Sequence, residues 1–307
     1  MTLNRETGST GSDGGSDGGD PLDDLLLVLR GIAERAGQAA LMFYQQEGGL
    51  EVTTKDDDSP LTQADLASDR VIRKALEERV PDIPIVSEEG VDQGNVPEVT
   101  ERFWLVDPLD GTKEFISGNG EFTVNIALIE HGQPVAGVVH APALGMTWAG
   151  AIQSDGTAKA TFAEINQAGK QIACRQIPEA GATVVASRRH GDPEEMKRFL
   201  GNYTIAEQRD AGSSIKFCLV ASGQADLYPR FGRTMEWDTA AGHAVLTAAG
   251  GRVTDAEGTP LTYGKPGFEN PPFIGYGLGE CGGARTQSLS PEVRFQVSGQ
   301  LRPLRAR

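Results

Sequence analysis

The spacing of apolar residues predicts two helices near the start of the chain. Apolar and small residues recur every three or four positions between Leu22 and Phe43, and again between Thr62 and Arg79. This is the period of one buried face of an amphipathic helix. Short apolar or alternating runs then predict strands, two of them joined by a hairpin turn at 131–133. These strands are expected at 85–87, 103–107, 122–130, 134–141 and, in hairpin form, roughly 145–153.

The second half of the chain alternates between strand-like and helix-like patterns. The first half therefore predicts a pair of helices over a mainly antiparallel sheet, and the second predicts an α/β unit, so the fold class is α+β. A crevice between the two halves is a natural place for a ligand. The expected helices of the second half are 193–200, 213–222 and 238–249, and the expected strands are 183–187, 204–208, 225–228 and 251–254.

The two ends of the chain differ from the rest in composition. Residues 1–20 are rich in glycine, serine and aspartate and hold almost nothing to bury, so we expect them to be disordered. The tail at 281–307 lacks periodic structure, and we expect it to be loose. The folded region is expected to span 21–280, with an α+β half at about 21–155 and an α/β half at about 156–280.

Charge narrows the range of partners. The chain has 43 acidic and 28 basic residues, a net charge of −15. A nucleic-acid polymer requires clustered lysine and arginine, so no such partner is expected. A small anionic substrate would need bound cations or a few well-placed basic side chains to overcome the overall negative field.

Cysteine usage and hydropathy suggest a compartment. The three cysteines, Cys174, Cys218 and Cys281, have neither the number of a disulfide framework nor the spacing of a metal site. A reducing, cytoplasmic location is therefore expected. No segment approaches the ~20 apolar residues of a membrane span, so membrane insertion is not expected. The first residues lack a basic region followed by an apolar run, so no secretory signal is expected.

The run WLVDPLDGT carries the strongest chemical signal. Asp107 and Asp110 lie three positions apart across a proline, at the end of an apolar strand. A tight turn there aims both carboxylates at one point and leaves the Leu109 carbonyl facing the same way, and such oxygen ligands suit a hard cation such as Mg²⁺. The amides of Gly111 and Thr112, at an expected helix start, favour an anion. The run alone leaves open an ordinary turn capped by aspartate.

Four further acidic residues allow two interpretations each. Glu88 and Glu89 follow an apolar strand, where adjacent acids form either a site or a solvated loop. Asp238 precedes a helix of small residues, where it can be the N-cap, a metal ligand or both. Asp65 matches a capping box with Thr62. None of these positions is decisive by itself.

Together these segments resemble the inositol monophosphatase superfamily in order and spacing. The signature of that family is an acidic pair after a strand, then Asp-Pro-(Leu/Ile)-Asp-Gly-Thr, then Trp-Asp before a small-residue helix that ends in Gly-Gly. The resemblance covers roughly residues 22–280 and implies the layered α-β-α-β-α fold of inositol monophosphatase-like sugar phosphatases. The matching segments are Ser87–Gly90, Asp107–Thr112, Trp237-Asp238 and Gly250-Gly251.

Finer stretches resemble the CysQ-type branch, the 3'(2'),5'-bisphosphate nucleotidases. This resemblance implies hydrolysis of the 3'-phosphate of 3'-phosphoadenosine 5'-phosphate to AMP and phosphate, which recycles a by-product of sulfur assimilation. It also implies inhibition by Li⁺. One departure is Thr247, which stands where relatives often carry glutamate. The stretches are Thr112–Leu128, Ser187–His190, Gly212–Cys218, Ala225–Arg230 and Glu236–His243.

The resemblance also implies a metal site. Two or three Mg²⁺ ions would be held by one carbonyl oxygen and four carboxylates. Asp65 and Thr112, together with Glu88, would position and deprotonate the attacking water. The implied metal ligands are Glu88, Asp107, Asp110, Asp238 and the Leu109 carbonyl.

The substrate contacts follow from the same resemblance. It implies that the amides of Gly111 and Thr112 hold the scissile phosphate, and that His190 lies near the base or ribose. Three residues would contact the second phosphate or the nucleotide. They are Ser213, Lys216 and Arg230.

Two alternative functions differ from this interpretation. The first is an inositol-1-phosphate or fructose-1,6-bisphosphate phosphatase with the same metal site. Lys216 and Arg230 suggest a second anionic group, which disfavours a simple monophosphate but not a sugar bisphosphate. The second is a non-catalytic phosphate-binding regulator, which the sequence disfavours because each expected ligand position carries its carboxylate. A small phosphorylated molecule is the expected partner, and the sequence leaves a homodimer open.

Overall fold

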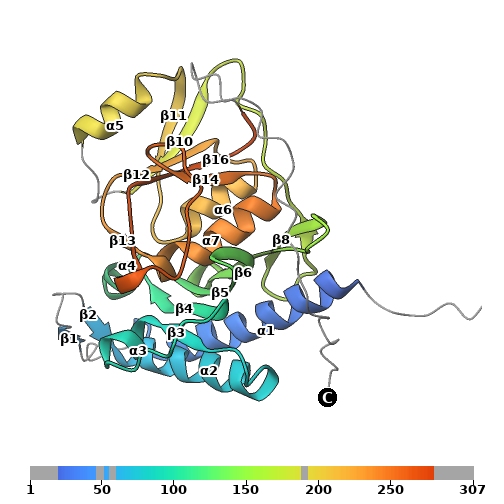
Figure 1. Ribbon diagram of the computed structural model, residues 1–307. Coiled ribbons are helices and arrows are strands. Elements are labelled where there is room, and N and C mark those ends of the chain that lie inside the picture. Colours follow the sequence, from blue (N-terminus) through green and yellow to red (C-terminus); the bar gives the residue numbers. More distant parts are fainter. Residues whose placement is uncertain (1–19, 46–51, 55–59, 188–192, 280–307) are drawn as a thin grey trace, which may run out of the picture.

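The computed structural model describes residues 20–45, 52–54, 60–187 and 193–279, which form two main sheets with helices between and outside them (Figure 1). The larger sheet has the strand order β3-β4-β5-β6-β7-β8-β9. β3 pairs with β4 in parallel, and the other neighbours pair antiparallel. Its strands are β3 (Ile85–Ser87), β4 (Arg102–Asp110), β5 (Thr123–Glu130), β6 (Gln133–Ala141), β7 (Met146–Ile152), β8 (Ala158–Glu164) and β9 (Lys170–Gln171).

The second sheet is mixed and has the order β11-β10-β12-β16-β14. β10 runs parallel to β11 and β12, whereas β16 pairs antiparallel with β12 and β14. Its strands are β10 (Ala182–Ala186), β11 (Ile205–Asp210), β12 (Leu227–Arg230), β14 (Arg252–Asp255) and β16 (Phe273–Tyr276). Two short ladders complete the strands, β1 (Val52–Thr54) with β2 (Pro60–Thr62) and β13 (Thr234–Met235) with β15 (Glu269–Asn270).

Helices form three layers that alternate with the two sheets (Figure 1). The expected α-β-α-β-α order is therefore confirmed. The first layer is α1 (Pro21–Leu41) and α2 (Gln63–Arg79), the middle layer α6 (Ile215–Ala221) and α7 (Glu236–Ala248), and the last α5 (Pro193–Leu200). The short helices are α3 (Glu88–Asp92) and α4 (Thr112–Ser117), with the 3₁₀ turns η1 (Pro142–Leu144) and η2 (Pro266–Phe268).

The apolar stripe of α1 attaches this helix to the larger sheet. Leu22, Leu26 and Leu29 are buried in a cluster with side chains of β4, β5 and β6. The helix begins with Pro21 after Asp20, whose carboxylate accepts the Leu22 N–H at 3.0 Å. A side-chain cap and a proline at the first position both favour a helix start. The helix predicted from the period is confirmed.

α7 is buried on nearly all sides because both sheets cover it. Eleven of its 13 residues are buried, as expected for a helix in the interior of a layered fold. The larger sheet approaches it closely: a Cβ on Gly137 of β6 would lie 2.7 Å from the Ala241 carbonyl oxygen, and one on Gly150 of β7 would lie 2.8 Å from Cα of Val245. This packing sets the depth of α7, whose first turn carries Asp238.

Most expected elements are present with limits within two residues, but some differ. β4 continues to Asp110 instead of ending at 107, because its pairing with β5 resumes after an irregularity. The expected hairpin at 145–153 is the single strand β7, which pairs with β6 and with the unexpected β8. β16 was also not expected, although it lies between β12 and β14. Its four apolar residues are buried and show no alternation, which is typical of a strand covered on both faces.

Several expectations lie outside the described residues. They concern His190, most of the segment 1–20 and the tail 281–307. The division of the folded region into two halves near residue 155 remains a prediction. Among the described helices, none combines the length and the apolar character needed to cross a membrane.

Acid is expected to destabilise the protein through His140 on β6. Its Nδ1 lies 2.9 Å from Thr147 Oγ1 and 3.1 Å from the Met146 carbonyl oxygen. Burial lowers the pKa of His140 from 6.5 to about 4. The unfolded chain therefore binds a proton between pH 6.5 and 4 that the folded chain excludes, and stability falls as the pH drops through this window.

Comparing His140→Asn with the wild-type protein isolates this effect, because Asn can still donate to the Met146 carbonyl. Urea unfolding from pH 7.5 to 4.5 should show a steeper loss of stability in the wild-type protein, with a difference in slope of up to about 1.4 kcal/mol per pH unit. Parallel curves for the two proteins would contradict the prediction. His243, whose burial lowers its pKa to about 3, contributes equally to both.

Candidate active site

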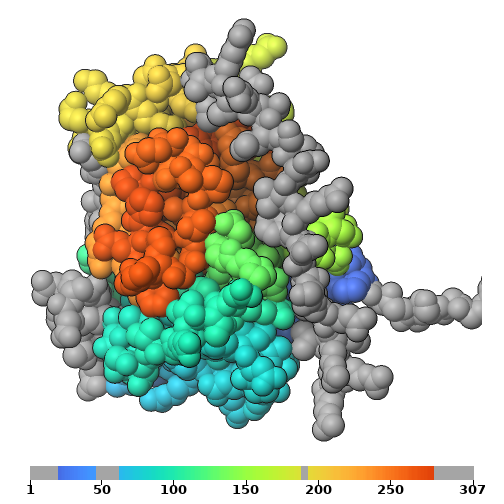
Figure 2. Space-filling model, viewed as in Figure 1, coloured from blue at the N-terminus to red at the C-terminus, as the bar shows by residue number. Residues whose placement is uncertain are grey.

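Four of the acidic residues identified in the sequence lie close enough for their charges to act on one another. β3 and β4 run parallel, so Glu88 at the start of α3 emerges beside Asp107. The charges of Glu88, Asp110 and Asp238 all act on Asp107. In the space-filling view the orange surface, late in the chain, lies directly against the teal surface, early in the chain (Figure 2). The packing of the two sheets thus brings distant carboxylates to one place.

A bulge in β4 orients two of these carboxylates. Asp107 pairs with Asn125 and Asp110 with Thr123, so two residues of β4 stand opposite one of β5. Such a bulge bends the strand and redirects side chains. Its shape is held by two contacts: the Leu109 N–H donates to Asp107 Oδ1 at 3.0 Å, and Ser68 Oγ on α2 donates to the Pro108 carbonyl at 2.7 Å. Because the bulge interrupts the regular pairing of β4 with β5, Pro108 is tolerated within a buried strand.

Asp110 is held by a set of polar side chains. Ser214 Oγ lies 3.1 Å from Asp110 Oδ2 and 2.8 Å from the Asp238 carbonyl oxygen. Thr123 Oγ1 and Asn125 Nδ2 each lie 3.4 Å from the same carboxylate oxygen. Ser214 therefore connects the bulge of β4 to the start of α7.

Asp238 is not the N-cap of its helix, so that interpretation is wrong. α7 begins two residues earlier, at Glu236, and Met235 is the N-cap residue. Asp238 occupies the third helical position, and its Oδ2 accepts the Met235 N–H at 2.8 Å. The helix starts early because Glu236 and Trp237 are buried between the sheets and continue its packed face.

The electrostatics of the site are unfavourable without a cation. Burial, followed by the charges of the neighbouring carboxylates, raises the pKa values of Asp107 and Asp238 well above their usual range. Burial also raises the pKa of Asp110, against the opposing effects of Lys216 and of the Ser214 hydrogen bond. Buried carboxylates this close are stable in the charged form only when a positive charge compensates them.

The available donors fit a hard divalent cation. The atoms offered are carboxylate and carbonyl oxygens, the type that Mg²⁺ prefers. Within the described ranges, one trio of acidic side chains, Glu88, Glu89 and Asp92 of α3, has ligand oxygens that all lie within 4.8 Å of one another. Asn125, beside Asp110, has a buried amide oxygen with no hydrogen-bond partner in the described part of the chain. This acidic trio of α3 could therefore bind a metal ion, and of the expected metal ligands only Glu88 belongs to it.

Asp65 and Thr112 lie next to the Leu109 carbonyl. Asp65 Oδ2 accepts the N–H and the hydroxyl of Thr62, at 2.9 and 2.5 Å, which confirms the expected capping box of α2. Asp65 Oδ1 lies 3.5 Å from Thr112 Oγ1, which is also 3.5 Å from the Leu109 carbonyl oxygen. The capping box fixes Oδ2 of Asp65 and leaves Oδ1 facing the hydroxyl of Thr112.

Gly111 lies close to the side chain of Ser213. Its φ is +91°, a left-handed conformation, and a Cβ there would lie 2.3 Å from Ser213 Oγ. Both features require glycine. Gly111 is the N-cap of α4, and no side chain caps the helix start. Amides at such a start are suited to an anion.

Contacts of Ser213 and Glu121 connect distant segments of the chain beside this turn. Ser213 Oγ lies 2.9 Å from the Asp110 carbonyl and 2.8 Å from the Glu121 carbonyl. The Glu121 carboxylate accepts the Gly212 N–H at 2.8 Å. Ser213 has a φ of +45°, uncommon for a residue other than glycine, and this set of contacts holds it there.

Lys216 and Arg230 form a positive pair next to the acidic residues. Lys216 Nζ donates to the carbonyls of Ala211 and Ser213, at 3.1 and 2.6 Å, and lies over the Tyr228 ring. Burial lowers the pKa of Lys216 to about 8, with Asp110 raising it and Arg230 lowering it. Arg230 is 9% exposed, and its charge also acts on Asp238. Two of the hydrogen bonds that Lys216 can donate are therefore used to hold the backbone of the 211–213 loop.

Sequence reasoning did not identify some residues that shape the site. Thr123 and Asn125 could have been found, because they are polar residues at alternate positions of an apolar strand. Ser68 and Glu121 carry no local signal. The missed residues are Ser68, Glu121, Thr123, Asn125 and Ser214.

Comparisons with known proteins agree over most of the chain. The family model described as inositol monophosphatase family matches residues 22–279. The 3'(2'),5'-bisphosphate nucleotidase CysQ of Escherichia coli (strain K12) is 47% identical over 243 residues, which are 79% of this chain and 95% of that protein. The protein of the same name from Haemophilus influenzae is 33% identical over 249 residues, 79% of this chain and 89% of that protein.

Solved structures show the same similarity. A crystal structure of CysQ from Bacteroides thetaiotaomicron, a bacterial member of the inositol monophosphatase family, matches with a TM-score of 0.68 and 35% identity, over 82% of this chain and 97% of that one. An inositol monophosphatase from Zymomonas mobilis matches with a TM-score of 0.65 and 25% identity, over 83% and 92% of the two chains.

Proposed function

Because the chain belongs to the inositol monophosphatase family, we propose that it is a Mg²⁺-dependent 3'(2'),5'-bisphosphate nucleotidase. Its substrate would be 3'-phosphoadenosine 5'-phosphate, hydrolysed to AMP and phosphate. The observation that carries this proposal is the 47% identity to a nucleotidase over 95% of that protein's length. The positive pair of Lys216 and Arg230 beside the acidic residues supports a substrate with a second anionic group.

The acidic residues would hold two or three Mg²⁺ ions. The proposed ligands are Glu88, Asp107, Asp110, Asp238 and the Leu109 carbonyl. When bound, Mg²⁺ neutralises phosphate charge and lowers the pKa of a coordinated water. Asp65 would orient the water and accept its proton through the hydroxyl of Thr112, which lies 3.5 Å from the Asp65 carboxylate.

The remaining residues would position the substrate. The amides of Gly111 and Thr112 at the start of α4 would hold the scissile phosphate, where they compensate charge that develops during attack. Ser213, Lys216 and Arg230 would hold the second phosphate. Because Ser213 also contacts the Asp110 carbonyl, the two anion sites would keep a fixed separation. We propose that His190 contacts the base or ribose.

Phosphate release from three substrates tests this function. 3'-Phosphoadenosine 5'-phosphate, inositol-1-phosphate and fructose-1,6-bisphosphate are compared in Mg²⁺, each with and without Li⁺. We expect the nucleotide to have the highest kcat/KM by at least about 10-fold, since a matched second anion is worth more than 1.4 kcal/mol. Millimolar Li⁺ is expected to inhibit the reaction by replacing Mg²⁺.

Two other results of this comparison would contradict parts of the proposal. A preference for the inositol phosphate or the sugar bisphosphate would preserve the metal site and overturn the assignment of Ser213, Lys216 and Arg230. No release from any of the three would favour a non-catalytic phosphate-binding protein.

We also propose a cytoplasmic location and a homodimer. The two described cysteines, Cys174 and Cys218, are buried free thiols, which suits a reducing compartment. Light scattering on the purified protein would test the dimer.

A further inference from the structure

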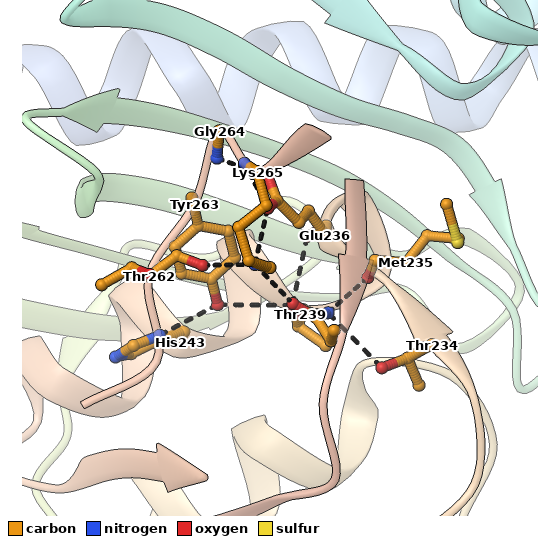
Figure 3. Close-up of polar contacts among 10 residues, drawn as sticks. Thr234, Met235, Glu236, Thr239, His243, Thr262, Tyr263, Gly264 and Lys265 are labelled. Atoms are coloured by element: carbon orange, nitrogen blue, oxygen red, sulfur yellow. Dashed lines mark hydrogen bonds and ion pairs between the residues drawn. The ribbon is translucent and has the colours of Figure 1, made fainter. Parts of the chain in front are cut away.

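A buried carboxylate at the start of α7 is bound by a distant loop. The Glu236 side chain is fully buried and forms an ion pair with Lys265 Nζ at 2.6 Å. It also accepts the N–H groups of Gly264 and Lys265, at 2.6 and 3.0 Å. Figure 3 shows Glu236 directed toward this loop. A buried charge needs such compensation, so Glu236 and the loop hold each other in place.

Asn270 connects the same loop to the residue before the helix. Its Nδ2 donates to the Met235 carbonyl at 2.8 Å and to Thr239 Oγ1 at 3.0 Å. Lys265 Nζ lies 3.3 Å from Asn270 Oδ1, so this lysine connects Asn270 to Glu236. Met235 is also the residue whose N–H is bound by Asp238. The peptide groups of Met235 are therefore held from both sides, by Asn270 and by Asp238.

A third contact secures the next turn of α7. Tyr263 OH lies 3.3 Å from Thr239 Oγ1, which donates to the Glu236 carbonyl at 3.1 Å. The same hydroxyl lies 2.9 Å from His243 Nδ1. In Figure 3, Tyr263 lies between Thr239 and His243. Contacts from this loop therefore hold α7 immediately before and after Asp238.

We infer that Glu236, Lys265 and Asn270 are positioning residues that hold Asp238 in the metal site. The physical reason is that Asp238 faces other carboxylates, whose charges repel it in the metal-free protein. A fixed first turn keeps its carboxylate in place against that repulsion, so less of the metal-binding free energy is lost in reorganising the site. This inference rests on the proposed role of Asp238 as a metal ligand.

The test measures Mg²⁺ binding directly. Isothermal titration calorimetry with Mg²⁺, and the Mg²⁺-induced rise in Tm, are compared for wild type, Lys265→Met and Asn270→Ala. We expect the Mg²⁺ Kd to rise about 10-fold to 100-fold in both variants, and the rise in Tm to shrink. Lys265→Arg keeps the charge and should restore most of the affinity.

A matched control is another ion pair between a buried carboxylate and a partly exposed cation, at a place away from the proposed metal ligands. Arg175 binds both oxygens of the fully buried Asp226, each at 2.9 Å, at the end of β12 opposite Arg230. Arg175→Met should lower the metal-free Tm and leave the Mg²⁺ Kd unchanged. If Lys265→Met does not fold, Glu236→Gln retains the shape of the side chain and one of the two backbone contacts while removing the charge.

The outcomes separate this inference from the proposed function. Wild-type Mg²⁺ affinity in folded Lys265→Met and Asn270→Ala would overturn the positioning role and leave the metal site intact. An increase in Kd equal to that of the Arg175→Met control would also overturn it, since the effect would then reflect general destabilisation. Absence of Mg²⁺ binding by the wild-type protein would overturn the proposed metal site itself, and this inference with it.

Discussion

Asp107→Asn is expected to abolish phosphate release while raising the melting temperature of the metal-free protein. Asp107 is 1% exposed and faces the charges of Glu88, Asp110 and Asp238. Asparagine keeps the shape and can accept the Leu109 N–H, but it removes one of the repelling charges. Loss of a metal ligand should reduce kcat by more than about 10³-fold, because metal charge supplies several kcal/mol of transition-state stabilisation.

The gain in stability should depend on pH. The pKa of Asp107 is raised in the folded protein, so the folded state binds a proton that the unfolded chain releases above pH 3.8. The metal-free wild-type protein therefore loses stability as the pH rises through the raised pKa, and Asp107→Asn does not suffer this loss. We expect a Tm at least about 2 °C above wild type at pH 8 in EDTA, with a smaller difference at pH 5.

Calorimetry and phosphate release on the same preparations check both effects. Asp82→Asn, at an exposed position in a turn, is the control and should change neither quantity. An Asp107→Asn protein with near-wild-type turnover would refute the metal-ligand role. A lower Tm in EDTA would show that repulsion among the carboxylates is not what limits the stability of the metal-free site.

Arg230→Gln is expected to reduce selectivity for a doubly phosphorylated substrate. Arg230 is nearly buried and lies close enough to Lys216 to lower the pKa of that lysine. If it binds the second phosphate, its loss leaves that anion uncompensated in a buried place, a cost of about 2–5 kcal/mol. The kcat/KM for 3'-phosphoadenosine 5'-phosphate should fall about 10²-fold, and that for inositol-1-phosphate should change little.

Arg233→Gln provides the matched control for this prediction. Arg233 is three residues away, its side chain is 58% exposed, and it forms an ion pair with Glu269. This variant should retain both activities, since an exposed pair contributes little. An equal loss for the two substrates in Arg230→Gln would indicate damage to the metal site instead of a lost phosphate contact.

Much of the site could be anticipated because its signals are local. The strand that ends in Asp-Pro-Leu-Asp-Gly-Thr predicts a strand, a sharp turn and a helix start within nine residues, and the structure has β4, a bulge and α4 there. The capping box of Thr62 and Asp65 is likewise a contact between residues three apart. Helix limits were less certain. The start of α7 was expected at Asp238 because acidic residues favour N-caps, but burial of Glu236 extends the helix.

The sequence by itself thus determined most of the elements and the acidic positions with chemical potential, because these depend on neighbours along the chain. The layered class followed from the family resemblance. Only the tertiary structure decided which of these residues face one another. Asp107 and Asp238 are 131 positions apart, and they meet because α7 packs between two sheets. The contacts of Glu121 with Gly212 and of Glu236 with Lys265 likewise arise from that packing. Partners of this kind leave no periodic pattern in the sequence. They are brought together by burial and close approach across layers, and local conformational preference plays no part in pairing them.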